Sequence, residues 1–188
     1  LASNGIHEGT MNYLIGNRDL KTENSLQTDL AFGINSEHLS GELSLFYNSI
    51  DHYIFQQKLP AFDGNDSITD GYVTYKYAAG NAQLGGGELS FDLHPHPLDW
   101  LHFENTLSYV IAVQRNKQGE EKFLPQIPAP RLTSELRADF NKAGKIFNNV
   151  YFRFEVEYTF RQDNVYNAFN TETVTPEYLL LHIGTGAD

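Results

Sequence analysis

The chain has 188 residues, a formal net charge of −11 and a pI near 5.0. Nucleic-acid binding needs clustered Lys and Arg, so this acidic balance argues against a nucleic-acid partner. The chain has no cysteine, which excludes thiolate metal sites, thiol catalysis and disulfides. No apolar run approaches 20 residues, so no transmembrane helix is expected. A mean hydropathy of −0.42 is nevertheless compatible with a membrane barrel, in which only alternate residues face lipid.

Alternation of apolar and polar residues with a period of two predicts strands from residue 24 onward. The first two strands, 24–34 and 39–55, are separated by a short polar turn. A third extended segment follows at 73–93, and its Gly-rich middle, 80–87, is a candidate for a bulge or bend. His94-Pro95-His96-Pro97 ends this segment, because each proline removes a donor from the ladder.

Four further strands are predicted at 99–114, 131–140, 149–161 and 177–185. The strand 149–161, NVYFRFEVEYTFR, has the clearest pattern. Val, Phe and Tyr occupy one of its faces, while Arg, Glu and Thr dominate the other. Its length and its two faces suit a barrel wall between lipid and a wet lumen. Taken alone, the strand favours the edge of a soluble β-sandwich, with one face on the core and one in water.

The connections between the predicted strands alternate between short and long. Short turns at 35–38, 94–98 and 141–148 alternate with long polar connections at 56–71, 115–130 and 162–176. Outer-membrane barrels have short periplasmic turns and long extracellular loops, so this alternation favours an antiparallel up-and-down membrane barrel over a sandwich. The predicted fold class is therefore all-β, as a segment of about seven long strands. In this topology 39–55, 99–114 and 149–163 run outward.

Five motifs in chain order resemble TonB-dependent outer-membrane receptors. They are IGNRDLKTE at 15–23, LFYNSIDHYI at 45–54, YAAGNAQLGGGE at 77–88, LPQIP at 124–128 and TPEYLLLHIG at 175–184. The resemblance implies a bacterial outer-membrane location and a large barrel of the 22-strand type with an N-terminal plug. It also implies energy supplied by an inner-membrane TonB-type complex. We interpret residues 1–188 as a single barrel segment, a fragment near the C-terminal part of the barrel, with the plug and the final strands not present.

The function implied by the resemblance is import of a scarce nutrient, most simply a ferric siderophore or another iron complex. No enzymatic motif is found and no cofactor is expected. Zinc, haem and cobalamin are alternative cargoes within the family, and the SNGIH segment at 3–7 is similar to receptors proposed for zinc. A soluble β-sandwich binding module and a passive porin-like channel are alternatives from other classes.

Candidate ligand contacts lie at the end of the barrel that carries the long connections. They are His7 and Glu8, His52 by its lumen-facing parity, and Asp63 and Asp66 in the first long connection. Carboxylate and imidazole groups could meet a metal or a metal chelate. Ordinary solvated loop polarity is the competing interpretation.

Three further groups of side chains have plainer interpretations. Neutral imidazoles such as His94 and His96 could bind a metal ion, but a plain turn is favoured there. Glu155 and Glu157 share a strand face with arginines, which indicates a lumenal charge ladder rather than catalytic carboxylates. Aromatic residues near the outer end are expected in an outward-facing girdle, namely Tyr53, Phe55, Tyr75 and Tyr77.

Overall fold

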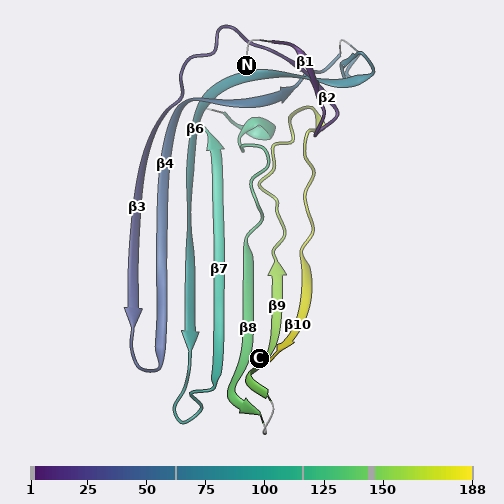
Figure 1. Ribbon diagram of the computed structural model, residues 1–188. Helices are drawn as coiled ribbons and strands as arrows, with labels where there is room; N and C mark the ends of the chain where they lie inside the picture. The colour runs from purple at the N-terminus through teal and green to yellow at the C-terminus, as the bar shows by residue number, and fades with distance from the viewer. Residues whose placement is uncertain (1–2, 62, 116, 144–146, 188) are drawn as a thin grey trace.

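Seven long strands form one antiparallel sheet in the computed structural model, which describes residues 3–61, 63–115, 117–143 and 147–187. The sheet order is β3-β4-β6-β7-β8-β9-β10, and Figure 1 shows the strands side by side. Their bounds are β3 Asn24–Asn35, β4 Leu39–Lys58, β6 Tyr72–Leu93, β7 Leu101–Gln114, β8 Arg131–Ala143, β9 Phe147–Thr159 and β10 Tyr178–Gly186. All seven predicted strands are confirmed, with ends that differ by a few residues.

Shorter elements gather at one end of the sheet. Strand β1 (Gly5–His7) pairs with β2 (Asn12–Ile15), which runs parallel to the start of β6, and β5 (Ile68–Thr69) also pairs with β6. Two single 3-10 turns, η1 (Gly119–Glu121) and η2 (Ala168–Asn170), lie in the long connections. Among the described residues, no helix is long and apolar enough to span a membrane.

The connections divide between the two ends of the sheet as the alternation of their lengths predicts. The short links 36–38 and 94–100 lie at the lower end in Figure 1. The long connections 59–71, 115–130 and 160–177 lie at the upper end. In outer-membrane barrels the short turns face the periplasm, so β4, β7 and β9 run outward.

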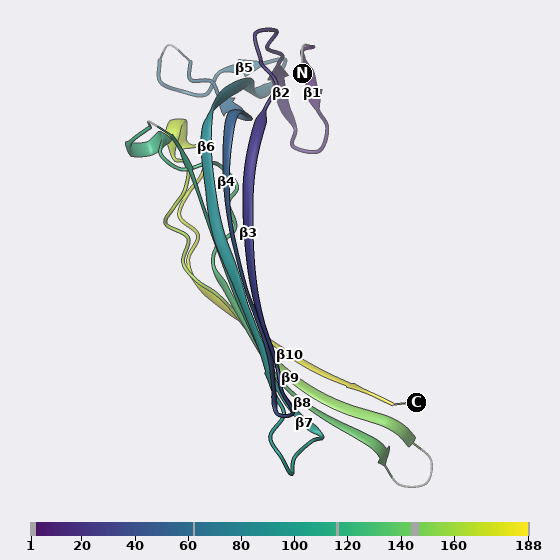
Figure 2. The ribbon, with the colours of Figure 1, turned by 90° about the vertical axis from the view of Figure 1, so that its left-hand side faces the viewer.

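One face of the sheet is apolar and exposed. Strand register aligns its side chains into rows that cross the whole sheet, one of which is Phe32, Leu43, Leu89, Leu107, Leu132, Tyr158 and Leu179. Leu107 is 40% exposed and Phe154 is 44% exposed. No second layer covers them in the part of the chain shown edge-on in Figure 2. The β-sandwich alternative is therefore wrong, because its core residues would be buried under a second sheet.

The opposite face carries the charged side chains. One row across the sheet contains Asp92, Glu104, Glu135, Glu155 and His182. The neighbouring row supplies arginines, and Arg153 Nη1 lies 3.4 Å from Glu135 Oε2. This arrangement agrees with the predicted lumenal charge ladder.

A β-bulge in the upper part of β4 corrects part of the girdle prediction. Ile50 pairs with Ala82 but Tyr53 pairs with Gly80, so β4 has one extra residue there. A single extra residue exchanges the two faces of a strand beyond that point. The irregularity lies in β4, opposite the Gly-rich stretch of β6 where a bulge was considered.

The exchanged faces place two aromatic side chains on the polar side of the sheet. Tyr53 packs against the buried cluster of Ala82 and Leu124, and the Phe55 ring contacts Tyr166 edge-on at 6.1 Å. Placing Tyr53 and Phe55 in an outward girdle was wrong for this reason. Strand β6 has no such register break, so Tyr75 keeps its outward parity.

A charge on the apolar face should be costly if that face contacts lipid. We expect Val156→Arg to lower the free energy of unfolding by about 2–4 kcal/mol if the site lies near the bilayer midplane. Urea titration of the full-length protein in lipid vesicles measures this quantity. The neighbouring polar-face change Glu155→Gln is the control and should have little effect. Equal effects of the two substitutions would contradict lipid contact.

A glycine in β6 makes room for its neighbours. A Cβ added at Gly86 would collide with the Tyr109 carbonyl oxygen and lie 2.8 Å from the Phe46 ring, whereas one at Gly85 would meet nothing closer than 3.7 Å. Gly86→Ala should therefore destabilise the protein by about 1–3 kcal/mol through overpacking. Gly85→Ala is the matched control and should have little effect on the free energy of unfolding in the same urea titration. An unchanged free energy of unfolding in both variants would contradict the overpacking at Gly86.

Candidate functional site

A cavity of about 670 Å³ opens on the polar side of the sheet, between the upper parts of β7, β8 and β9 and two long connections. Strand residues such as Arg131, Glu157 and Thr159 form its floor. The connections 115–130 and 160–177 supply Gln126, Ile127, Pro128, Gln162 and Glu172. Its volume lies within the range of about 300–1,000 Å³ that is typical of small-molecule sites.

Two side chains join the connections that enclose this cavity. Gln162 Nε2 donates to the carbonyl oxygens of Ile127 at 3.2 Å and of Pro128 at 3.0 Å. The Glu172 carboxylate accepts hydrogen bonds from the backbone N–H groups of Gln126 and Tyr166. The side chains of Gln162 and Glu172 thus pair with backbone groups of both connections, and this pairing stabilises the wall of the cavity.

The connections are anchored on the sheet by apolar side chains. Leu124 is fully buried against Ala82 and Ala112. Tyr166 is 1% exposed, and burial raises the pKa of Tyr166 to about 12. The Tyr166 phenol therefore stays neutral at physiological pH. Because Leu124 and Tyr166 are buried, the two connections fold back onto the upper polar face of the sheet rather than extending into solvent.

The cavity floor offers polar contacts of both signs. Arg131 Nη1 lies 3.9 Å from Glu157 Oε1, a loose and partly exposed pair. The Thr159 hydroxyl is buried and has no hydrogen-bonding partner among the described residues. Because an unpaired buried hydroxyl is costly, a bound ligand or water would satisfy it.

None of the five contact residues predicted from the sequence is among the described residues that line this cavity. His7 and Glu8 are exposed at the β1–β2 hairpin, where His7 Nδ1 lies 3.1 Å from Thr10 Oγ1. Hydrogen bonds from Asn65 lower the pKa of the Asp63 carboxyl. Asp66 Oδ1 forms an ion pair with Lys58 Nζ at 2.7 Å.

His52 lies in the bulge of β4, so its simple parity argument fails. Its backbone has a φ of 60°, and its N–H donates to Asn81 Oδ1 at 3.2 Å. Within the described ranges, the groups of His, Asp and Glu close enough to share an ion are Asp92–His94–His102 and Glu155–Glu157–His182. Neither group contains a predicted contact residue.

Sequence reasoning missed the residues that do enclose the cavity. Gln162 and Glu172 lie in a connection with no periodic pattern, and nothing in the local sequence distinguishes them from other polar loop residues. Their pairing with Pro128 and Gln126 depends on two connections that meet only in the folded sheet.

One exposed apolar face, one charged face, and short and long connections at opposite ends define the wall of an outer-membrane β-barrel. The family model described as "TonB dependent receptor-like, beta-barrel" matches residues 1–187. The chain therefore belongs to the TonB-dependent receptor family, a family of outer-membrane transporters and not of enzymes.

Solved structures agree on the fold at low sequence identity. The chain is similar to the copper transporter OprC (13% identity, TM-score 0.69), covering 88% of this chain and 23% of that one. It is similar to the FrpB iron transporter from Neisseria meningitidis (14%, 0.61), covering 96% and 26%. It is also similar to a ferric enterobactin receptor, PfeA, from Pseudomonas aeruginosa (20%, 0.62), covering 92% and 24%. The chain thus spans about a quarter of each receptor.

The junction between the two connections can be tested by changing one amide. Gln162→Glu replaces a donor that faces two carbonyl oxygens with a carboxylate, which would repel them. We expect trypsin to cleave the connection 115–130, which contains Lys117 and Lys122, at least several-fold faster in the variant.

The exposed residue next to Gln162 provides the control for this experiment. Asp163 pairs with Arg161 at the surface, where an ion pair contributes little, so Asp163→Asn should be cleaved at the wild-type rate. Unchanged cleavage of Gln162→Glu would show that Gln162 does not hold the connections together.

Proposed function

We propose that this chain forms part of an outer-membrane receptor that imports a scarce nutrient, with a ferric siderophore or another iron complex as the cargo. The observation that carries the proposal is the cavity between two long loops on the lumenal face of a TonB-dependent receptor barrel. Two of the similar structures are named as an iron transporter and a ferric enterobactin receptor, which supports iron as the first cargo to test.

The cavity suits an organic chelate better than a bare ion. Its size fits a molecule of drug-like dimensions. Its described wall combines apolar side chains such as Ile127 and Val165 with many polar and charged groups, including the unpaired Thr159 hydroxyl. Such a wall can hold a ligand by shape and fix its orientation with hydrogen bonds.

The partner implied by the family is an inner-membrane TonB-type complex that supplies energy through a plug domain. No bond is made or broken in such import; the receptor captures the chelate and releases it inward. Outer-membrane lipid is the second partner, in contact with the exposed apolar face.

The five residues predicted from the sequence at the long-loop end remain predicted contacts for the incoming ligand; all are exposed except His52, which is half-buried. These are His7, Glu8, His52, Asp63 and Asp66. Asp66 is already paired with Lys58 and Asp63 with Asn65, so His7 and Glu8 are the pair to change first. Alanine at both positions should slow uptake without changing the folded state.

The experiment is uptake of radioactive iron by a strain that lacks the receptor gene and carries it on a plasmid. Thr159→Val removes the unpaired hydroxyl while keeping the side-chain shape. If the ligand uses that hydrogen bond, the concentration of iron chelate that gives half-maximal uptake should rise by about 3–10-fold. Thr106→Val, on the same sheet face but outside the described cavity lining, is the matched control and should behave as wild type.

Parallel assays with zinc, haem and cobalamin decide the cargo. Uptake of iron chelates that requires both the receptor gene and an intact TonB complex supports the proposal. Uptake of another cargo, with none of iron, would overturn the siderophore assignment. Uptake that continues without the TonB complex would indicate a passive channel.

A further inference from the structure

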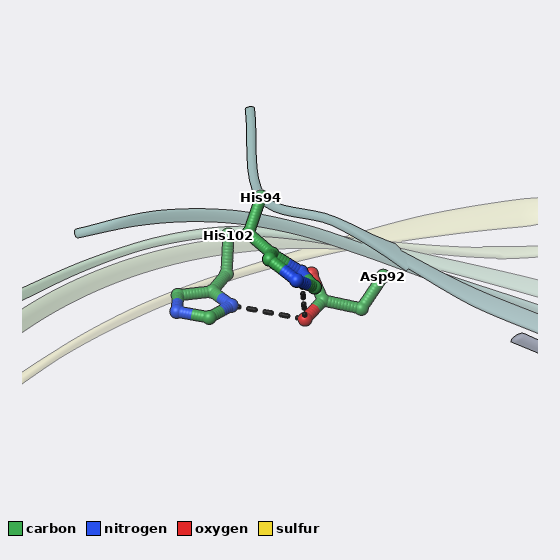
Figure 3. A group of neighbouring side chains, drawn as sticks. All are labelled: Asp92, His94 and His102. Carbon is green, nitrogen blue, oxygen red and sulfur yellow. Dashed lines mark hydrogen bonds and ion pairs between the residues drawn. The ribbon is translucent and has the colours of Figure 1, made fainter. Parts of the chain in front are cut away.

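Three metal-ligating side chains meet at the short-turn end of the sheet, far from the cavity between the long loops. Asp92 lies at the end of β6, His94 in the link that follows it, and His102 at the start of β7. Figure 3 shows the two imidazole rings and the carboxylate turned toward one another. The backbone N–H of His94 donates to the His38 carbonyl oxygen, which fixes this link against the neighbouring turn.

The ligand atoms lie at spacings that suit a shared ion. His102 Nδ1 is 2.9 Å and His94 Nδ1 is 3.4 Å from the same atom, Asp92 Oδ2. One ligand atom from each residue lies within 4.8 Å of the other two. Metal–ligand distances of about 2.0–2.2 Å in a tetrahedral site place ligand atoms roughly 3.3–3.6 Å apart. Only small side-chain movements separate this arrangement from such a site.

Two atoms of the cluster are left without a hydrogen bond. Asp92 Oδ1 and His94 Nδ1 are both buried and have no hydrogen-bonding partner among the described residues, since the 3.4 Å contact of His94 Nδ1 with Asp92 Oδ2 is an ion pair only when the imidazole is protonated. The side chains are 23–29% exposed, so the cluster is sheltered yet reachable from the lumen. Buried polar atoms are rarely left unpaired, and an ion or a bound water would account for both atoms.

The surroundings leave the cluster free to bind a cation. Arg137, opposite His102 in the register, is held by two hydrogen bonds to Asp139 and lies over the Tyr151 ring. His96, in the same link, is exposed and contacts Asp99 and the His38 ring instead. His94 and His96 were considered together from the sequence, but the structure brings only His94 into the cluster.

We propose that Asp92, His94 and His102 bind one divalent transition-metal ion, of the zinc or copper class, on the periplasmic part of the barrel lumen. Two imidazoles and one carboxylate favour such ions, whereas Mg²⁺ and Ca²⁺ prefer oxygen ligands alone. Three protein ligands leave a further coordination position open toward the lumen. The proposal concerns this end of the wall and does not depend on which nutrient the receptor imports.

The test measures binding of Zn²⁺ and Co²⁺ to the full-length protein purified in detergent. Calorimetry with Zn²⁺ should show a site that His94→Gln and His102→Gln each weaken by at least about tenfold. Co²⁺ should give a visible absorption band that is lost in both variants, because Co²⁺ absorbs strongly in this range only when protein ligands hold it at low coordination number instead of octahedral hydration. His96→Gln is the matched control in the same link and should bind as wild type.

Several results would overturn the proposal. The wild-type protein could fail to bind either ion, or His96→Gln could weaken binding as much as His102→Gln. Binding that survives His102→Gln but is lost in His182→Gln would assign the ion to the Glu155–Glu157–His182 group instead. Heat-modifiable gel migration shows whether each variant is folded. Iron uptake measured in the same variants separates a failure of this site from a failure of the proposed import function.

Discussion

The structure depends on one constraint: every backbone N–H and C=O group inside a bilayer must be paired within the protein. The antiparallel ladder from β3 to β10 meets this requirement between neighbouring strands, while the outer edges of β3 and β10 have no strand partner among the described residues. Once the ladder is fixed, alternate side chains must point to opposite faces. The apolar rows, the charge ladder and the division of turns and loops between the two ends all follow from it.

The long connections pack against the lumenal face of the sheet and leave the apolar face uncovered. Leu124 and Tyr166 fold back onto the upper lumenal face and turn it into a small apolar core. The β4 bulge contributes by turning Tyr53 and Phe55 toward that core. The cavity therefore lies between a rigid strand floor and loops that the same core holds in place.

Much of the fold could be predicted from the sequence, because strand periodicity and turn composition are local signals. The strands at 24–34 and 149–161 show this. The bulge at His52 could not be predicted, because a one-residue offset leaves the pattern of each half of β4 intact. Strands β1 and β2 were missed because they are only three and four residues long.

The sites divide in the same way. Gln162 and Glu172 act across two loops, so no local pattern identifies them. The Asp92–His94–His102 cluster could have been predicted from the sequence. The hairpin register that pairs Leu93 with Phe103 also places residue 94 opposite residue 102. The prediction considered His94 with His96 because they are close in sequence, and it therefore missed that His94 lies opposite His102 across the hairpin.

The central claim is that the apolar face contacts lipid while the charged face lines a lumen. Because this chain has no native cysteine, single spin labels can be placed at Leu107 and Phe154 on one face and at Thr106 and Glu155 on the other. In lipid vesicles, labels at Leu107 and Phe154 should be relaxed strongly by oxygen and weakly by a water-soluble nickel chelate. Labels on both faces that respond equally to the nickel chelate would contradict the account.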